Sequence, residues 1–130
     1  MKKINYAGPS ITSDDINAVK DAVEHGFYEN YKKNTTDLEN KLCELLDIKY
    51  ALATNSCTAA LHLALASLDL EEGDEIITSD SSCVATALPI NYVGAKAVFV
   101  DIDPTTLSMS SKEIIKKLKQ NIPNKILYVA

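Results

Sequence analysis

The stretch that decides the predicted fold is Tyr50–Leu68, which reads YALATNSCTAALHLALASL. Its first residues are mostly apolar, small polar residues follow at Thr54–Thr58, and a long helical pattern begins at once. A buried strand that runs directly into a helix through small polar residues is typical of an anion-binding edge in a parallel sheet. The stretch therefore predicts a strand at Tyr50–Thr54, a helix at Thr58–Leu68 and an anion pocket where they meet.

The alternation of strand and helix continues to the end of the sequence. Further strands are predicted at Glu75–Thr78, Ala97–Asp101 and Ile126–Ala130, and further helices at Cys83–Val93 and Ser111–Lys119. The strand segments are rich in Ile, Val and Ala and lack polar alternation, as expected for strands buried on both faces. The predicted fold class is therefore α/β: a three-layer, mostly parallel sheet with right-handed crossovers and helices on both faces.

An amphipathic helix is predicted near the beginning of the chain. Thr12 or Ser13 can cap its first turn, and Gly26 can end it. Its apolar residues recur at helical spacing, so we expect them to form one buried face. These residues are Ile16, Val19 and Val23.

A second helix is predicted to begin with the capping-box spacing of Thr36 and Glu39 and to end near Leu46. The residues between the two helices, FYENYKKN (27–34), are rich in aromatic and polar side chains and are predicted to form a loop. The apolar stripe of the second helix consists of Leu38, Leu42 and Leu45.

The 130 residues have the size of one domain. We expect a helical lead-in at 1–48 and alternating strands and helices at 49–130. An apolar strand at the very end and a sheet with few covering helices indicate the incomplete first part of a larger domain. A small domain closed by its last strand is the alternative.

Composition excludes several classes of protein. The formal net charge is −5 and charges of both signs are interleaved, so binding to nucleic acid is not expected. There is no apolar run of about 18 residues and no signal peptide, so no membrane span is expected. The spacing of Cys43, Cys57 and Cys83 fits neither a zinc site nor a disulfide framework, which predicts reduced thiols and a cytoplasmic protein.

The polar residues at two predicted strand ends are candidates for binding. Asn55–Thr58 begins a helix, whose first amides lack internal partners and attract an anion such as phosphate. Ser56 and Thr58 can add hydroxyl donors, although either can also serve only as a helix cap. A second polar cluster, Ser79–Cys83, is expected at the same sheet edge. The Gly-rich signatures of P-loops and of dinucleotide-binding folds are absent from the sequence.

These segments resemble the sugar aminotransferases of the DegT/StrS type, which depend on pyridoxal 5'-phosphate (PLP) and have the aspartate-aminotransferase fold. The resemblance is carried by NSCTAALHLALASLDLEEGDEIIT (55–78), VATALPINYVGAKAVFVDIDPTTL (84–107) and the lead-in YAGPSIT, and covers about residues 5–130. It implies transfer of an amino group, usually from glutamate, to a keto-sugar nucleotide in amino-sugar or surface-polysaccharide biosynthesis. It also implies a homodimer with active sites at the interface.

The resemblance places the cofactor on four residues. The phosphate loop falls on Ser56, Cys57 and Thr58, whose amides, with the Thr58 hydroxyl, would hold the PLP phosphate. Many members of the family have Gly where Cys57 stands. The residue that stacks on the pyridine ring falls on Cys83, where members often have an aromatic residue. A thiol there covers less of the ring.

The resemblance also implies a sugar pocket at Tyr28, Asn30 and Tyr31, and it leaves the catalytic lysine unassigned. Transamination needs a lysine that forms a Schiff base with PLP and a carboxylate at the pyridine nitrogen. In the family both follow the part that matches this chain. The lysines here are expected at the opposite sheet edge or on the surface, so we predict no catalytic residue and a chain that is inactive alone.

Alternative interpretations remain at several residues. Asp101 and Asp103 could be a metal pair, but the following Pro104 favours a turn. His62 could reach the phosphate or pack within its helix, and a Cys–His pair with Cys57 or Cys83 would need an orienting third group. For the whole protein the alternatives are a PLP-dependent sugar dehydratase, a non-catalytic phosphate- or nucleotide-binding module, and a remnant without activity. The sequence leaves the sugar and its aminated position open.

Overall fold

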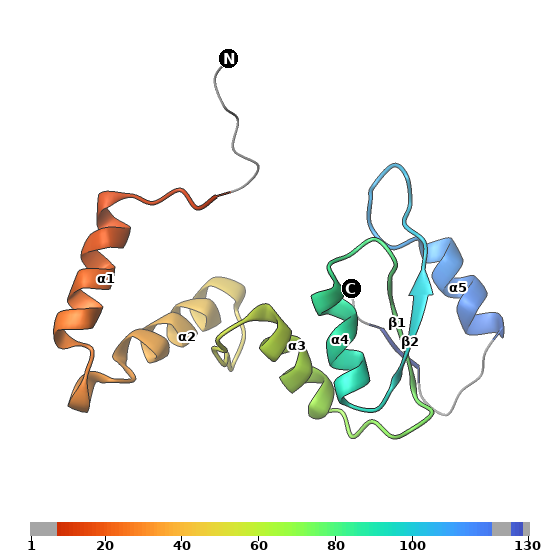
Figure 1. Ribbon diagram of the computed structural model, residues 1–130, viewed down its shortest axis with the longest axis horizontal. Coiled ribbons are helices and arrows are strands. Elements are labelled where there is room, and N and C mark those ends of the chain that lie inside the picture. Colours follow the sequence, from red (N-terminus) through yellow and green to blue (C-terminus); the bar gives the residue numbers. More distant parts are fainter. Residues whose placement is uncertain (1–7, 121–125, 129–130) are drawn as a thin grey trace, which may run out of the picture. The chain divides into compact units, whose positions relative to one another are not determined.

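The computed structural model describes residues 8–120 and 126–128 and divides at Ala53/Thr54 into two units, which we describe separately. Among the described residues, no helix has the length and apolar content to cross a membrane. The first unit contains α1 (Ser13–His25), the 3-10 helix η1 (Tyr28–Asn30) and α2 (Lys33–Leu46) (Figure 1). The second contains α3 (Cys57–Ala66), β1 (Glu75–Ser79), α4 (Val84–Tyr92), β2 (Lys96–Val100), α5 (Ser111–Gln120) and β3 (Ile126–Tyr128).

A parallel sheet organises the second unit. Its strand order is β2-β1-β3, and β1 pairs in parallel with both neighbours. Glu75 begins the register by pairing with Lys96 of β2 and with Ile126 of β3. The predicted parallel sheet is confirmed. The predicted end of the last strand at residues 129–130 lies outside the described residues.

Side chains of β1 alternate between two hydrophobic clusters, one on each face of the sheet. Ile76 packs in a cluster with Leu65 of α3 and Ile90 of α4. Ile77 packs on the opposite face with Val100 of β2 and Ile114 of α5. Figure 1 shows α4 and α5 on opposite sides of the strands. The three layers predicted from the sequence are therefore present, although Phe99 of the outer strand β2 is half exposed.

The first helix begins and ends where the sequence predicts. The Thr12 hydroxyl accepts the Asp15 N–H, and the Asp15 carboxylate accepts the Thr12 N–H at 2.7 Å, which forms a reciprocal capping box. Gly26 ends α1, and a Cβ at this position would lie 2.3 Å from the carbonyl oxygen of Ala22. Any larger residue would have to displace the last helical turn.

The second helix differs from its prediction. It begins at Lys33 instead of Thr36, and its N-cap, Lys32, makes no side-chain capping bond. The predicted capping box is wrong because the Glu39 carboxylate accepts the N–H of Ala53 at 2.8 Å instead. The segment predicted as a loop also contains η1 and the first residues of α2. A contact between residues 14 positions apart in the sequence thus replaces the local one.

The predicted strand at Tyr50–Thr54 is also wrong. These residues adopt no regular secondary structure, and among the described residues no strand pairs with them. A strand requires a neighbouring strand to receive its backbone hydrogen bonds. Here the Ala53 amide is bound by the Glu39 side chain, and Tyr50 is largely exposed.

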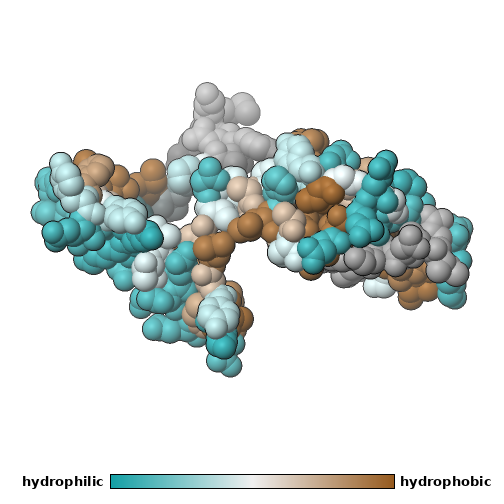
Figure 2. Space-filling view, turned by 90° about the horizontal axis from the view of Figure 1, so that it is seen from below, coloured by the Kyte–Doolittle hydropathy of each residue, from teal (hydrophilic) through white to brown (hydrophobic). Residues whose placement is uncertain are grey.

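The apolar stripes of α1 and α2 are exposed, contrary to the buried faces expected from the sequence. Ile16, Val19 and Val23 retain 61–65% of their accessible surface, and Leu38 and Leu45 retain 53% and 79%. None of the described residues of the first unit is buried. The apolar residues recur at helical spacing, but no core in this unit covers them. Brown patches in Figure 2 show hydrophobic side chains at the molecular surface.

Replacement of Ile76 with alanine tests the role of β1. Ile76 is fully buried, so Ile76→Ala should lower the free energy of unfolding by about 2–5 kcal/mol. Urea unfolding followed by circular dichroism measures this change. Val84→Ala, at an exposed position of α4, is the matched control and should change the value by less than about 0.5 kcal/mol. Equal effects of both variants would contradict the role assigned to β1.

Candidate functional site

The start of α3 carries the central feature of the candidate site. Ser56 is the N-cap in extended conformation, and its hydroxyl oxygen accepts the Ala59 N–H at 3.2 Å. The Ser56 carbonyl oxygen accepts the Ala60 N–H at 3.0 Å and the Thr54 hydroxyl at 2.9 Å. These bonds fix the chain as it enters the helix. The predicted cap function of Ser56 is thus confirmed.

Two backbone amides at this helix start have no acceptor among the described residues. They belong to Cys57 and Thr58, the first two residues of α3. The first turn of α3 contains no acidic residue, whereas α1 places Asp14 and Asp15 in its first turn. Cys57 is exposed and Thr58 is half-buried. An incoming anion therefore finds free donors, the positive end of the helix dipole and no competing carboxylate within that turn.

The start of α4 lies directly after β1. Cys83 is the N-cap of α4, is exposed, and makes no side-chain capping bond. Ser82 and Thr86 bridge the first turn through their hydroxyls at 2.8 Å. The Asp80 N–H donates to the Val100 carbonyl oxygen at 3.1 Å and thereby ties the segment to the end of β2.

Helices α3 and α4 pack against each other, and α4 begins after the carboxyl end of β1. Leu65 and Ile90 lie in the second halves of their helices and belong to one cluster. The His62 ring also meets the Tyr92 ring edge-on, with 5.3 Å between the centroids. These contacts make the two helices run in the same direction, so Cys57 and Cys83 begin neighbouring helices. His62 is exposed and contacts Tyr92.

Thr78 carries a polar atom that lacks a partner. Its side chain is fully buried, and its hydroxyl oxygen has no hydrogen-bond partner among the described residues. Strand alternation puts Thr78 on the face of Ile76, which α3 and α4 cover. It is the fourth of the five residues of β1 and therefore lies toward the carboxyl end of the strand. A buried hydroxyl without a partner is costly to the folded state.

The predicted sugar-binding residues belong to the first unit. Tyr28 is 93% exposed and has a φ of 53°, a left-handed conformation that is unusual for an aromatic residue. Such strain is common at functional sites. Asn30 follows at the end of η1, and Tyr31 comes next.

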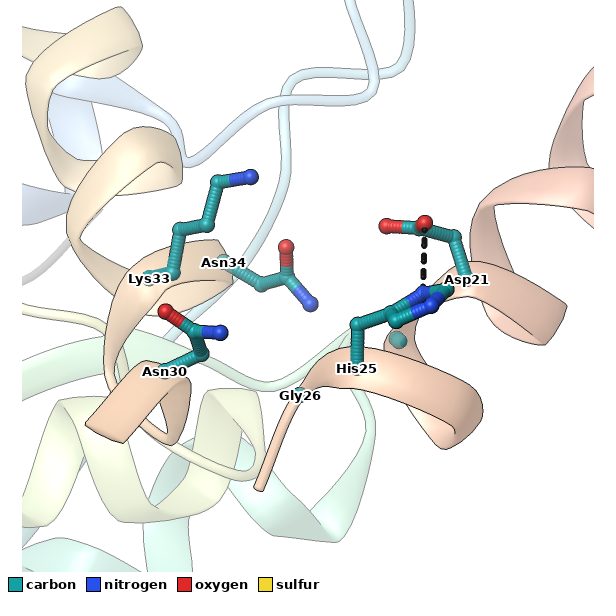
Figure 3. Close-up of a pocket in the computed structure, with 7 residues that line it drawn as sticks. Asp21, His25, Gly26, Asn30, Lys33 and Asn34 are labelled. Carbon is teal, nitrogen blue, oxygen red and sulfur yellow. Dashed lines mark hydrogen bonds and ion pairs between the residues drawn. The ribbon is translucent and has the colours of Figure 1, made fainter. Parts of the chain in front are cut away.

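Asn30 and Tyr31 line two different hollows. Asn30 shares a hollow of about 30 Å³ with Asp21, His25, Lys33 and Asn34. Figure 3 shows the amides of Asn30 and Asn34 facing the hydrogen bond between His25 and Asp21, which spans 3.1 Å. This volume is about that of one water molecule and cannot hold a sugar ring.

Tyr31 lies beside a wider space of the same unit. This hollow has about 440 Å³ and is lined in addition by Lys32, Thr35, Thr36, Glu39, Leu52 and Ala53. The Lys32 ammonium also lies 5.3 Å from the centroid of the Tyr31 ring. The structure thus keeps the three predicted sugar-binding residues adjacent along the chain but does not direct their side chains into one pocket.

The lysines of the second unit lie outside α3 and α4. Lys96 begins β2 and forms an ion pair with Glu75 at 2.7 Å, at the amino end of the strands. The other described lysines of this unit belong to α5, on the opposite face of the sheet: Lys112, Lys116, Lys117 and Lys119. Lys125 lies outside the described residues. The placement of these described lysines confirms the prediction from the sequence.

Asp101 and Asp103 stabilise their own turn. The Asp103 carboxylate accepts the amides of Thr105 and Thr106 at 2.8 and 3.1 Å. These bonds lower the pKa of Asp103. The Asp101 carboxylate accepts the N–H of Ile102 at 2.8 Å. The bonds of Asp103 and the turn at residues 104–106 agree with the turn interpretation.

Residues 9–129 match the DegT/DnrJ/EryC1/StrS aminotransferase family. The match covers nearly the whole sequence. The chain belongs to this family. The family predicted from the motifs at residues 55–78 and 84–107 is therefore confirmed.

Solved structures of aminotransferases are similar to the chain. A Streptococcus pneumoniae protein assigned as a sugar aminotransferase, in its PLP form, has 31% sequence identity and a TM-score of 0.78, with 96% of this chain and 31% of that chain covered. An aminotransferase from Psychrobacter cryohalolentis has 30% identity and a TM-score of 0.75, covering 83% and 28%. The α/β fold and the PLP form of the Streptococcus pneumoniae protein agree with the predictions from the sequence.

A dehydratase also resembles the chain. The GDP-4-keto-6-deoxy-D-mannose-3-dehydratase of E. coli, with bound hydrated PLP, has 27% identity and a TM-score of 0.73, covering 95% of this chain and 32% of that chain. The DegT-family chain described here spans less than a third of the length of each of these relatives. The fold is therefore shared by aminotransferases and dehydratases of sugars.

The sequence analysis missed two features of the described units. Thr78 reads as one more residue of a buried strand, and only the packing of both sheet faces shows that its hydroxyl has no partner. Glu39 fits a capping box by its spacing, and only the tertiary contact shows that it binds Ala53. A polar residue within an apolar strand was the one signal that could have indicated Thr78.

Titration of Asp103 tests the turn. Since the pKa of Asp103 is lowered in the fold, its contribution to stability is present above the unfolded-state pKa and lost as pH falls through the folded-state pKa. Asp103→Asn should therefore flatten the acidic part of the curve of stability against pH. Carboxyl-carbon NMR should give a lower midpoint for Asp103 in the chain than in a peptide of residues 101–106. Equal midpoints would contradict the two amide bonds.

Proposed function

We propose that this chain forms the cofactor-phosphate part of a PLP-dependent aminotransferase that acts on a keto-sugar nucleotide. The observation that carries the proposal is the start of α3, where the amides of Cys57 and Thr58 are free and no acidic side chain lies in the first turn. Family membership over residues 9–129 gives this anion site its chemical identity.

The residues fit the phosphate of PLP. The amides of Cys57 and Thr58 would donate to phosphate oxygens, and the Thr58 hydroxyl would add a third bond, while Ser56 keeps the helix start in place. Donors on charged acceptors give strong hydrogen bonds. Cys83, at the start of α4, would lie against the pyridine ring. Its thiol covers less of a ring than an aromatic side chain would.

PLP supplies an electron sink at the amino-bearing carbon when a lysine and a carboxylate support it. We propose that the described part of this chain supplies neither. Lys96 is at the amino end of the strands, and the lysines of α5 are on the far face of the sheet. On this proposal the 130 residues bind and orient the cofactor phosphate but do not complete the reaction alone.

The substrate, partners and compartment follow from the family and from the sequence. We propose a nucleotide-linked keto-sugar as acceptor, glutamate as amino donor, contacts from Tyr28, Asn30 and Tyr31, and a homodimer for the intact protein. This activity would serve amino-sugar or surface-polysaccharide biosynthesis. The three cysteines form no disulfide, which supports a reducing compartment such as the cytoplasm.

A second candidate function is dehydration of a sugar. Its support is the similarity to the E. coli dehydratase, which is structurally nearly as close as the aminotransferases. Both reactions use PLP, so the phosphate site at α3 is the same for either. A phosphate- or nucleotide-binding module without catalysis would instead bind a nucleotide in the absence of PLP.

Titration of the 130-residue chain with PLP tests the proposed site. We expect saturable binding that inorganic phosphate competes away, because the free amides recognise the phosphate group. Borohydride reduction followed by mass spectrometry should show no lysine adduct of PLP. A reducible adduct on a single lysine would contradict the placement of the lysines, and absence of binding would contradict the cofactor site.

Replacement of Thr58 with valine tests the hydroxyl at the helix start. Loss of one bond to a charged phosphate should weaken PLP binding roughly 10- to 100-fold, since such bonds contribute about 1.5–3 kcal/mol. Fluorescence titration measures the dissociation constant. Ser67→Ala is the matched control, because Ser67 carries a hydroxyl at the other end of α3, where it donates to the Ala64 carbonyl. Equal losses in both variants would place the phosphate elsewhere.

A further inference from the structure

The outer edge of β2 lacks the features that usually protect an edge strand. In the order β2-β1-β3, β2 stands at one end, and among the described strands it pairs with β1 alone. Edge strands commonly carry charges or proline that prevent pairing with another chain. β2 has Lys96 at its first position, but residues 97–100 are all apolar, and Phe99 is 50% exposed.

The hydrogen bonds to β1 show which backbone groups of β2 face outward. The Lys96 N–H donates to the Asp74 carbonyl oxygen at 2.9 Å, and the Val100 carbonyl oxygen accepts the Asp80 N–H at 3.1 Å. The backbone groups of successive strand residues point to opposite sides. Since Lys96 and Val100 point to β1, the N–H and C=O groups of Ala97 and Phe99 point away from it. The described residues provide no hydrogen-bond partner for these groups.

The outward row of free groups is short, because the next residues along the chain are partly engaged. The Ala95 N–H donates to the Ile90 carbonyl oxygen at 3.2 Å. The Asp101 carbonyl oxygen accepts the Ser110 N–H at 3.0 Å. A strand that pairs with this edge therefore finds a complete set of donors and acceptors at Ala97 and Phe99.

We propose that the outer edge of β2 pairs antiparallel with the same edge of a second copy of this chain, centred on Val98. In this register Ala97 of each copy lies opposite Phe99 of the other. Each such pair exchanges both of its N–H···O bonds, so all the free groups of Ala97 and Phe99 gain partners. The inference goes beyond the proposed function, and the edge contains none of the residues assigned to the cofactor.

The side chains of β2 fit this register. Strand alternation places Ala97 and Phe99 on one face of the sheet and Val98 on the other. The half-exposed ring of Phe99 would lie over the Ala97 side chain of the second copy, which is small enough to leave room for it. On the opposite face Val98 would meet Val98 of the second copy. Aromatic and β-branched side chains in cross-strand contact stabilise a sheet.

The charges at the two ends of β2 favour the antiparallel direction. Lys96 begins the strand, and Asp101 follows its last residue. Antiparallel pairing brings the positive end of one copy to the negative end of the other. Parallel pairing would instead place the two Lys96 side chains beside each other, and like charges opposite each other destabilise a strand pair.

Cross-linking through a new cysteine tests the register. The background chain carries Cys43→Ser, Cys57→Ser and Cys83→Ser, and circular dichroism verifies its fold. Val98→Cys should form a disulfide between two copies on mild oxidation, because directly opposite residues without mutual hydrogen bonds have Cα atoms about 4.5 Å apart. Phe99→Cys is the matched control. Its two thiols would be offset by two positions along the strands, with Cα atoms beyond the limit of about 7 Å for a disulfide.

Non-reducing electrophoresis and mass spectrometry measure the cross-linked fraction. We expect a covalent dimer from Val98→Cys and little from Phe99→Cys. Equal cross-linking of both variants would indicate random collision and overturn the inference, as would absence of the dimer from Val98→Cys.

Sedimentation equilibrium tests the same edge without cysteine chemistry. We expect the wild-type chain to dimerise, and Phe99→Lys should raise the dissociation constant of the dimer at least about tenfold, because it places a charge in the pairing edge. Val19→Lys, on the exposed stripe of α1, is the control and should leave the constant within about twofold. Circular dichroism verifies that both variants are folded.

A monomeric wild-type chain would overturn the inference. So would a dimer that Val19→Lys dissociates and Phe99→Lys does not, since the contact would then involve the first unit. Neither experiment uses PLP binding as its readout, so failure of this inference leaves the cofactor proposal to its own titration.

Discussion

Burial of β1 on both faces is the constraint on which the second unit depends. Ile76 and Ile77 point in opposite directions because successive strand residues alternate. One therefore requires α3 and α4 as cover and the other requires α5. Parallel pairing of β1 with β2 then makes α4 the crossover between them, so α4 begins at the carboxyl edge of the sheet, and α3 packs against α4. The position of the candidate site is a consequence of this packing.

The chain satisfies its helix starts in different ways, and the difference marks the candidate site. At α1 the side chains of Thr12 and Asp15 satisfy backbone donors reciprocally. At α3 the Ser56 hydroxyl satisfies Ala59 alone and leaves two amides without protein acceptors among the described residues. A helix start that supplies its own carboxylate is closed to an external anion, whereas one without it is open.

In the first unit, the apolar spacing typical of packed helices is present although its described helices bury no residue. Its two helices carry apolar stripes, yet none of its described residues is buried. Short amphipathic helices obtain most of their stability from tertiary contacts, so these stripes require cover that the described unit does not provide. The relatives are about three times as long as this chain.

The sequence by itself determined the features that depend on short-range chemistry. These include the cap at Thr12, the end of α1 at Gly26, the three described strands and the polar start of α3. The sequence also identified the family, because the family motifs are short continuous segments. Tertiary structure decided the rest. The segment 50–54 forms no strand because pairing needs a partner, Glu39 binds Ala53 across 14 positions, and the Thr78 hydroxyl lacks a partner because both sheet faces are packed. Hydrogen-bond partners distant in sequence leave no periodic signal, so only the fold reveals them.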